Sequence, residues 1–523
     1  MKIIDFFKNR EKKIKSISIV TILVIFIYFI IQLFLLGSDW FIWDTKGFLT
    51  VKKFVNIFFL IYIFLIAVVI FLESKDPSST LAWLVVLILM PFVGFIFYIL
   101  FGRTIRKKFK SFSFNNNENI MLQNELLDYL TISDSTEQEY LDRHLIKLFI
   151  NNAQAPFSEN NKIEVLENGT RTYYKMIKDL KSAEKFIHFE FFIIKDDDIG
   201  NKFKNVLIDK AKEGLEVRVI YDSVGCWKLP KKYISQLKKA GVEVYSFSPV
   251  LFPLLSRDFN YRNHRKIITI DGKTGYIGGL NIGDEYLGKN KYLGFWRDTH
   301  LKIQGQSVLS IQNIFLKDWY HVSNEKIDDD KYFPKIEKDY GDSLIQIVSS
   351  GPDSKWQCIM KGYFTMITKA NKRIWINTPY LVPDPSLRTG LISAALSGVD
   401  VRIIIPNKPD HFLVYWSSRD NIEQLLRAGV KVYTYEKGFI HSKSILVDST
   451  VATVGTANFD YRSLEINYEI NAFIYDKKVV KTLEENYLKD LKDSKEIKLK
   501  QHLKRPIYEK FLEAFGRLVS PLQ

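Results

Sequence analysis

The chain has 523 residues, which is too long for one ordinary domain and predicts roughly two to four folding units. Its formal net charge of +15 points to an anionic partner, either nucleic acid or an acidic membrane surface. The two cysteines, Cys226 and Cys358, lie far apart and lack the spacing of a zinc site. The composition therefore argues against a disulfide framework and against cysteine-bound zinc.

Residues 1–110 contain three hydrophobic runs, and we assign them to a membrane segment. The run at 17–36 carries no charge, and as a helix it would be about 30 Å long, which matches the hydrocarbon core of a bilayer. A second run covers 54–72, and a third covers 81–101 with Pro91 inside it. A proline interrupts helical hydrogen bonding, so the third run either spans with a kink or re-enters. The sequence therefore predicts an N-terminal α-helical transmembrane segment.

The direction of the membrane segment stays open at this stage. Basic residues precede the first run and follow the third, and by the positive-inside rule both ends favour the cytoplasm. An odd number of full crossings cannot place both ends there. Either one of the three runs does not cross the membrane, or one of the two basic ends lies outside the cytoplasm.

Beyond the membrane segment, strand and helix patterns alternate, which predicts an α/β fold. We expect a linker with short helices at 111–165, a first lobe at 166–345 and a second lobe at 346–523. The reason for two lobes is an internal repeat. Its matched pairs are AEKFIHFEFFIIKDD with ANKRIWINTPYLVPDP, AKEGLEVRVI with ALSGVDVRII, and LKKAGVEVYSF with LLRAGVKVYTY. The pairs keep nearly constant separation, so the repeat is a duplicated domain and not a solenoid of short units.

One polar motif occurs once in each half, as NHRKIITIDG and as FIHSKSILVDST. Its residues are His264, Lys266, Asp271 and Asn281 in the first copy and His441, Lys443, Asp448 and Asn458 in the second. The intervals are identical in the two copies, which a solvated strand face would hardly produce. Residues i and i+2 of a strand share a face, so each copy presents one imidazole and one ammonium together. Asp271 and Gly272 are typical of a hairpin turn.

This residue set suits displacement at a phosphodiester. A covalent route needs a nucleophile on one side of phosphorus and a proton donor on the leaving-group side, and histidine serves as either near neutral pH. Two lysines would offset the charge on the nonbridging oxygens, a task that other enzymes give to metal ions. The two aspartates are expected to orient the imidazoles through the second ring nitrogen, the alternative being a simple ion pair with lysine.

The doubled H-x-K-x₄-D pattern resembles the phospholipase D superfamily, and within it the whole chain resembles bacterial cardiolipin synthases. The supporting stretches are DPSSTLAWLVVLILMPFVGFIFYILFGR, NYRNHRKIITIDGKTGYIGGLNIGDEYLG, WRDTHLKIQG, INTPYLVPD, HSKSILVD, NFDYRSLEINYEINAFIYD and LVSPLQ. The likeness runs from about residue 70 to the C-terminus. It implies a duplicated phospholipase D-type sandwich, with two pseudo-symmetric lobes that each hold a mixed sheet flanked by helices. The extra run at 17–36 departs from the two membrane segments usual in that family and leaves the topology open.

The resemblance also implies an activity. Two phosphatidylglycerol molecules would give cardiolipin and glycerol through a phosphohistidine, without a cofactor or a metal. We assign His264 as the nucleophile and His441 as the acid and base, although the symmetry of the motif cannot fix that order. The supporting carboxylates are expected to be Glu190, Asp298, Glu465 and Glu469, each of which is equally a candidate structural ion-pair partner.

Three other functions remain to be weighed. A membrane-bound phospholipase D would hydrolyse phospholipid to phosphatidic acid by the same chemistry, with water in place of the second alcohol. A nuclease is less consistent with the membrane segment, because anionic lipid accounts for the basic charge. A non-enzymatic scaffold would not need two complete motifs. We therefore expect an anionic phospholipid substrate, no nucleic-acid partner, and a multi-pass protein of the bacterial cell membrane whose catalytic lobes face the cytoplasm.

Overall fold

The computed structural model describes residues 80, 83–87, 94, 98, 137–249 and 260–519. The hydrophobic runs at 17–36 and 54–72, and most of the run at 81–101, lie outside these described residues. Within the described part of the chain, no helix is both long enough and apolar enough to cross a membrane. The chain divides into two compact units, Met1–Thr104 and Ile105–Gln523, and the second contains both copies of the motif.

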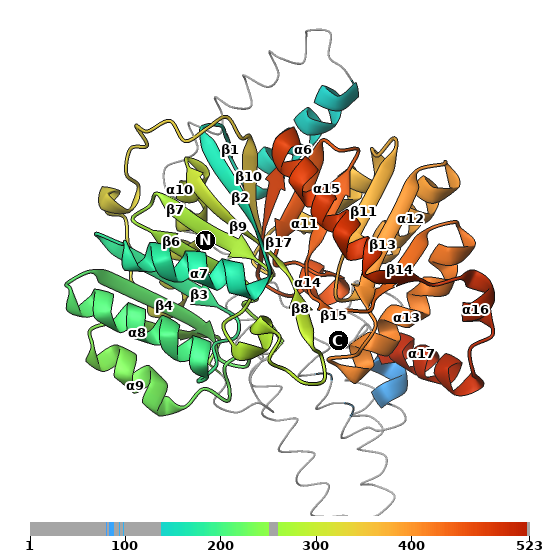
Figure 1. Ribbon diagram of the computed structural model, residues 1–523, viewed down its shortest axis with the longest axis horizontal. Helices are drawn as coiled ribbons and strands as arrows, with labels where there is room; N and C mark the ends of the chain where they lie inside the picture. The colour runs from blue at the N-terminus through green and yellow to red at the C-terminus, as the bar shows by residue number, and fades with distance from the viewer. Residues whose placement is uncertain are drawn as a thin grey trace, which may run out of the picture. The chain divides into compact units, whose positions relative to one another are not determined.

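The second unit is built on two large mixed sheets, one in each lobe (Figure 1). In spatial order the first sheet is β2 (Asn161–Glu167), β9 (Thr299–Gly305), β7 (Thr274–Gly278), β6 (Lys266–Ile270), β3 (Phe186–Phe191), β4 (Glu216–Asp222) and β5 (Glu243–Phe247). The second is β1 (Phe157–Ser158), β10 (Ile345–Ser350), β19 (Glu469–Ile474), β17 (Val451–Gly455), β16 (Ser444–Val447), β11 (Arg373–Asn377), β13 (Asp400–Pro406), β14 (Lys431–Tyr435) and β20 (Ser494–Glu496).

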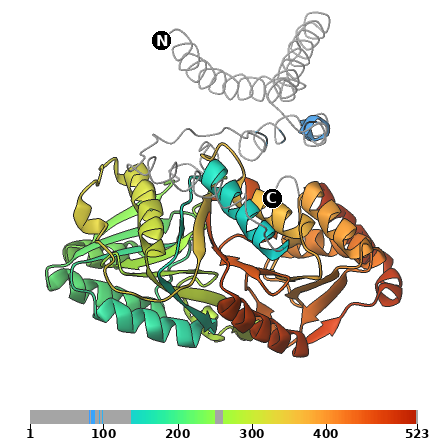
Figure 2. The same cartoon turned by 90° about the horizontal axis from the view of Figure 1, so that it is seen from above.

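The two sheets repeat one strand order. Strands β3, β4 and β5 are parallel, as are β11, β13 and β14, and the motif hairpins β6–β7 and β16–β17 run antiparallel beside them. Both sheets are therefore mixed, and the duplication predicted from the repeat is confirmed. Viewed from above, the green lobe and the orange-to-red lobe lie side by side (Figure 2).

Helices cover the sheets on both sides. The helices of the first lobe are α7 (Asn168–Lys181), α8 (Asp198–Lys212), α9 (Lys231–Lys239) and α10 (Ser307–Ser323), with short turns η4 (Asp284–Leu287) and η5 (Asp330–Tyr332). Those of the second are α11 (Cys358–Thr368), α12 (Pro385–Leu396), α13 (Phe412–Arg427), α14 (Tyr461–Glu465), α15 (Lys477–Lys492), α16 (Leu499–Leu503) and α17 (Ile507–Val519). Because both faces of each sheet are covered, the strands β3, β6 and β16 are buried at every residue.

The segment 111–165 contains more regular structure than a linker. Helix α6 (Glu137–Ala153) packs against α11 and β10 of the second lobe, and β1 joins the second sheet. The expected boundary between 165 and 166 falls inside β2, which pairs with β9 along seven residues of the first sheet. Alternating polar residues in NKIEVLE gave this edge strand a weak apolar signal, which explains the misplaced boundary.

Three hydrophobic clusters form the core, and the middle one belongs to both lobes. It contains Ile267 and Ile277 of the first sheet, Leu446 and Ile470 of the second, and the inner face of α10. The other two clusters lie under the outer helices of each lobe. Because the lobes share a buried core, the ends of β6 and β16 are held in a fixed relation to each other.

Two short pairings cross from one lobe to the other beside the motifs. Strand β8 (Phe295–Arg297) of the first lobe pairs in parallel with β15 (Gly438–Ile440) of the second. At the equivalent place, Asn263 forms an isolated parallel bridge with Tyr468. A further small pairing, β12 (Leu381–Val382) with β18 (Phe459–Asp460), lies within the second lobe.

Candidate active site

The two motif hairpins have the tight turns expected from their sequences. Asp271 and Gly272 connect β6 to β7 with φ of 53° and 64°, and Asp448 and Ser449 connect β16 to β17 with φ of 51° and 63°. Two successive left-handed residues are typical of a type I′ turn, whose twist matches that of the flanking strands. Strand β6 begins two residues after His264, and β16 begins three residues after His441.

Each histidine is fixed by the main chain of the opposite lobe. The His264 N–H donates to the Tyr468 carbonyl at 2.9 Å, and the His441 N–H donates to the Arg297 carbonyl at 2.7 Å. These bonds belong to the crossing pairings described above. They bring two histidines that are 177 positions apart in the sequence, at 264 and 441, to one place.

A carboxylate of the opposite lobe binds Nδ1 of each imidazole. His264 Nδ1 lies 3.0 Å from Glu469 Oε1, and His441 Nδ1 lies 2.7 Å from Asp298 Oδ2. A ring that donates from Nδ1 keeps its Nε2 lone pair for chemistry. Of the four supporting carboxylates expected from the sequence, Asp298 and Glu469 are therefore brought to the histidines.

The expected role of Asp271 and Asp448 is wrong. The Asp271 carboxylate accepts three backbone N–H groups, from Glu184, Lys185 and Phe186, at 2.8–2.9 Å. Asp448 accepts the equivalent three, from Asn371, Lys372 and Arg373, at 2.7–2.9 Å. Both aspartates lie at the far end of their strands, five residues beyond the lysine. A strand rises about 3.3 Å per residue, so neither carboxylate reaches an imidazole or forms the alternative lysine ion pair.

Glu190 and Glu465 support neither histidine directly. Glu190 accepts a hydrogen bond from the Asn263 side chain, and burial raises its pKa well above the usual range, with the charge of Asp318 acting in the same direction. Glu465 accepts a hydrogen bond from Gln357 Nε2 at 2.7 Å. Neither residue lines the cavity described below.

The two lysines of the motifs are held alike and are almost completely buried. Lys266 Nζ donates to the His264 carbonyl at 2.6 Å, and Lys443 Nζ donates to the His441 carbonyl at 2.6 Å. Burial lowers the pKa of Lys266 to about 7 and that of Lys443 to about 8, against the opposing pull of Glu469 and Asp298 respectively. The charge of Lys443 also lowers the pKa of Lys266, so the two ammonium groups lie close enough to interact.

Both imidazoles are neutral at neutral pH in the free site. Burial lowers the pKa of His264 to about 4, although Glu469 opposes the shift. Burial and then the charge of Lys443 lower the pKa of His441 to about 4. Glu469 is itself buried, but the charge and hydrogen bond of His264 hold its pKa below the usual value. The site therefore pairs neutral imidazoles with ionised carboxylates.

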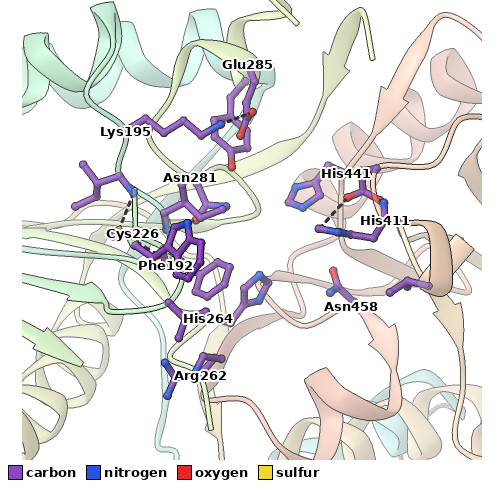
Figure 3. Close-up of a pocket in the computed structure, with 18 of the residues that line it drawn as sticks. Phe192, Lys195, Cys226, Arg262, His264, Asn281, Glu285, His411, His441 and Asn458 are labelled. Atoms are coloured by element: carbon purple, nitrogen blue, oxygen red, sulfur yellow. Dashed lines mark hydrogen bonds and ion pairs between the residues drawn. The ribbon is translucent and has the colours of Figure 1, made fainter. Parts of the chain in front are cut away.

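A cavity of about 1060 Å³ opens over the two histidines. His264 and His441 both line this cavity, His264 from the lobe on the left of Figure 3 and His441 from the lobe on the right. Asn281 and Asn458 lie beside them. Asn281 Oδ1 accepts the Ile193 N–H at 3.1 Å, whereas the buried Asn458 Oδ1 has no hydrogen-bond partner within the described residues. The volume suits a ligand larger than water, since pockets for drug-sized molecules measure about 300–1,000 Å³.

The close approach of backbone behind the histidines depends on glycine. A Cβ atom on Gly279 would lie 2.1 Å from Asp298 Oδ1, so only glycine leaves room for the carboxylate that binds His441. At Gly455, a Cβ atom would lie 2.2 Å from Asn471 Oδ1. These contacts give the glycines near each motif a packing reason.

Sequence reasoning missed three residues in the wall of the cavity, Arg262, Trp296 and Arg462. Trp296 packs against His441 with ring centroids 5.1 Å apart, and Arg262 lies two residues before His264. Their place in the sequence could have identified them, because each lies within four residues of a motif residue or of its carboxylate partner. Of the residues described, no group of three or more His, Cys, Asp or Glu is arranged to hold a metal ion.

Comparison with known proteins gives a consistent result. The family profile described as "Cardiolipin synthase, PLD-like domain" matches residues 176–319 and 363–491, and the profile described as "Phospholipase_D-nuclease N-terminal" matches 60–103. The "Cardiolipin synthase" of Alkalihalophilus pseudofirmus is 45% identical over 474 residues, which cover 89% of this chain and 93% of that protein. The "Major cardiolipin synthase ClsA" of Bacillus subtilis is 42% identical over 476 residues, covering 89% and 98%.

Solved structures support the fold. The crystal structure of phosphatidylserine synthase from Haemophilus influenzae is similar with a TM-score of 0.56 at 16% sequence identity, and the match covers 73% of this chain and all of that chain. At this identity the likeness concerns architecture alone. The doubled motif, the two-lobed fold and the extent of the sequence matches lead to one conclusion: this chain belongs to the cardiolipin synthase family of the phospholipase D superfamily.

Proposed function

We propose that the protein is a cardiolipin synthase that transfers a phosphatidyl group from one phosphatidylglycerol to another. The observation that carries the proposal is the pair of histidines at one cavity, each hydrogen-bonded through Nδ1 to a carboxylate of the opposite lobe. Relatives named cardiolipin synthase, at 42–45% identity over most of the chain, support the choice of reaction.

In the first half-reaction, His264 Nε2 attacks the phosphorus of the donor lipid. A P–N bond forms, the P–O bond to the headgroup glycerol breaks, and His441 gives its proton to the departing alkoxide. Glycerol leaves, and the phosphatidyl group stays on His264. Glu469 stabilises the positive charge that His264 gains when it becomes a phosphohistidine.

In the second half-reaction, the terminal hydroxyl of the second phosphatidylglycerol gives its proton to the now neutral His441. Its oxygen forms a new P–O bond while the P–N bond breaks, which releases cardiolipin and returns His264 to its starting state. His441 loses a proton in the first half-reaction and regains one in the second, and His264 gains and then loses the phosphatidyl group. The enzyme therefore ends unchanged.

One observation supports this order of the histidines. The Asp298 contact to His441 is the shorter one, 2.7 Å against 3.0 Å, and a closer carboxylate favours the protonated imidazole that an acid needs. Both carboxylates accept further hydrogen bonds, Glu469 from Thr456 and Asn467 and Asp298 from the Thr299 N–H, so these bonds do not separate the two roles. The neutral, nucleophilic role suits His264 better.

The bound lipid supplies what the free site lacks. In the free site the pKa of His441 is lowered to about 4, so the acid is uncharged at neutral pH. A phosphodiester places a negative charge beside both imidazoles, which raises their pKa and favours the proton on His441. The ammonium groups of Lys266 and Lys443 offset the charge on the nonbridging oxygens, so the proposed chemistry uses no metal ion.

We place the enzyme in the cell membrane through the hydrophobic runs at 17–36, 54–72 and 81–101, as a multi-pass protein. The match of residues 60–103 to an N-terminal family profile supports a dedicated segment there. The basic residues that follow the third run favour a cytoplasmic position for the catalytic lobes.

The test is a product analysis with the purified full-length enzyme. It is incubated in mixed micelles with phosphatidylglycerol that carries one label in the headgroup glycerol and another in the acyl chains. We expect labelled cardiolipin and one free glycerol for each cardiolipin formed. Phosphatidic acid with glycerol and no cardiolipin would show a hydrolase, and the absence of lipid turnover would contradict lipid chemistry altogether.

A further inference from the structure

The pseudo-symmetry of the site ends at the wall of the cavity. Histidine, lysine, asparagine and carboxylate partners all occur in matched pairs, whereas three neighbouring positions do not match. Counted from the motif residues, Arg262 corresponds to Phe439, and Arg462 corresponds to Glu285. Counted from the carboxylates, Asn467 corresponds to Trp296. The chemistry is therefore duplicated, but the surroundings of the two histidines differ.

The side of His264 is cationic. Arg262 and Arg462 both line the cavity, and Arg262 is placed beside His264 in the close-up (Figure 3). Arg462 reaches across the lobes, because its Nη1 and Nη2 donate to Asn260 Oδ1 and to the Asn260 carbonyl at 2.9 Å. The two guanidinium groups lie close enough for the charge of Arg262 to act on Arg462.

Asp222, Asp460 and Glu469 act on Arg462, and each of them also has other partners, which for Glu469 include His264. Asp222 accepts N–H groups from Val224, Gly225 and Asn263 at 2.9–3.0 Å, and its contact with Arg262 is longer, at 3.5 Å. Asp460 caps α14 by accepting the Ser463 N–H at 2.6 Å. Both carboxylates therefore have structural reasons to be present beside the two cations.

Aromatic rings lie beside both histidines, since His264 packs against Phe192 with ring centroids 5.0 Å apart, but on the side of His441 the counterparts of the two arginines are Phe439 and Glu285. Trp296 packs between Tyr286, Phe439 and His441, with ring centroids 4.8, 4.9 and 5.1 Å apart. Glu285, the counterpart of Arg462, is paired with Lys195 at 2.5 Å. The side of His441 therefore offers an apolar surface and an ion pair without net charge. An anion would bind more favourably on the side of His264, beside the two arginines.

We infer that Arg262 and Arg462 form the binding site for the phosphodiester of the second, acceptor lipid, the one that is not broken. This inference rests on the proposed function. Cardiolipin has two phosphates joined by one glycerol, so the cavity must hold a second anion close to the reacting phosphorus. The motif lysines serve the reacting phosphate. Two lysines and two arginines line the cavity, but Lys195 is paired with Glu285 and Lys228 is exposed, whereas on the side of His264 Arg262 is buried and Arg462 is half-buried. A planar guanidinium binds two phosphate oxygens at once, which suits this role.

This assignment explains how a lipid alcohol competes with water. Water and glycerol have no phosphate, so they gain nothing from Arg262 and Arg462. A phosphatidylglycerol acceptor gains two charged contacts that orient its terminal hydroxyl toward the phosphohistidine. The arginines are thus positioning residues for the second half-reaction and have no place in the bond changes of the first.

The test measures two reactions in one sample of full-length enzyme. In phosphatidylglycerol micelles with radiolabelled glycerol, cardiolipin formation needs an acceptor with a phosphate, whereas exchange of labelled glycerol into phosphatidylglycerol does not. We expect Arg462→Gln and Arg262→Gln each to lower the ratio of cardiolipin formation to glycerol exchange at least tenfold. Arg462→Lys, which keeps the charge, should recover part of the ratio. Arg427→Gln, a half-exposed arginine paired with Glu423 on α13, is the matched control and should leave the ratio as it is.

Because both rates come from the same molecules, a misfolded fraction contributes to neither and cannot change the ratio. A proportional fall of both reactions in the Gln and Lys variants, or an unchanged ratio, would overturn the inference. A wild-type enzyme that exchanges glycerol but forms no cardiolipin would instead overturn the proposed function. The two failures are therefore distinguishable.

Discussion

At the scale of single residues, the site depends on how far burial shifts the protonation of its charged groups. The ammonium of Lys266 has its pKa lowered to about 7, and that of Lys443 to about 8. A depressed lysine pKa means that the charged form is lost as pH rises through that value. Both histidines, with pKa lowered to about 4, remain neutral across the same range.

The pH dependence of the reaction follows from the lysines. We predict that kcat/KM falls as pH rises through about 7 to 8, because phosphate binding needs both ammonium groups and the free enzyme loses them there. Lys266→Arg keeps its charge at all these pH values. In this variant the lower of the two basic transitions should disappear, while the rate at the optimum falls because the larger head fits less well.

The control for this profile is Lys437→Arg, at a half-exposed lysine paired with Asp493. It should leave the profile as in the wild type. A basic limb that stays in place in Lys266→Arg would show that another group, and not this lysine, sets it.

At the scale of elements, the motif aspartates hold hairpins in place. Asp271 binds the backbone at the start of β3, and Asp448 binds the backbone at the start of β11. Each thereby clamps the motif hairpin to the neighbouring strand, which runs antiparallel to it, and the histidine at the other end of the hairpin is positioned as a result. The residues that touch the imidazoles are Glu469 and Asp298.

This division of labour predicts different consequences for two similar substitutions. Asp271→Asn replaces an acceptor of three backbone N–H groups by an amide with one acceptor oxygen, and should lower the free energy of unfolding by about 1–3 kcal/mol. Activity per folded molecule should change little. Glu469→Gln should lower activity by about 10–100-fold, as is usual for a carboxylate that orients a functional histidine.

Denaturant unfolding and the rate per active molecule, measured side by side, separate the two effects. A loss of activity in Asp271→Asn as large as that in Glu469→Gln, at unchanged stability, would contradict this division of labour. That result would indicate that Asp271 orients the imidazole, as its place in the sequence motif had suggested.

The sequence predicted the histidine–lysine pairs of the site but did not assign the partners of the imidazoles, and the difference has a physical reason. The strand period and the exact spacing of the two copies were enough to pair His264 with Lys266 and His441 with Lys443. The partners of the imidazoles depend on crossing between lobes, at Tyr468 and Arg297, and no local pattern reports such a crossing. The role of Asp271 was misassigned because its interval of five residues beyond the lysine was considered without the length of the strand. Among the fold elements, β2 was missed because a half-exposed edge strand resembles a polar linker.

At the scale of the whole molecule, both lobes are needed for each half of the site. Each histidine takes a backbone bond and a carboxylate from the lobe that does not contain it, and one hydrophobic cluster joins the two sheets. A single lobe would therefore lack an oriented imidazole. All of these contacts lie within the compact unit Ile105–Gln523.

Deletion of residues 2–110 tests this division between membrane attachment and catalysis. We expect the shortened protein to unfold cooperatively and to form cardiolipin in detergent micelles within about threefold of the full-length rate, because the three hydrophobic clusters and the site remain. It should separate from membranes in a high-salt wash, which screens the attraction of its basic surface, whereas the full-length protein should stay. Full retention of the shortened protein after that wash would show that the membrane anchor lies elsewhere in the chain.

The central claim is that a phosphatidyl group passes through His264 while His441 moves the proton. The most direct measurement is the position of the covalent label in enzyme that is quenched during turnover of ³²P-labelled phosphatidylglycerol. Peptide mapping should find the label on His264 in the wild type, stable to base and labile to acid, and should find none in His264→Ala. Label on His441, or steady cardiolipin formation without any covalent label, would contradict the account.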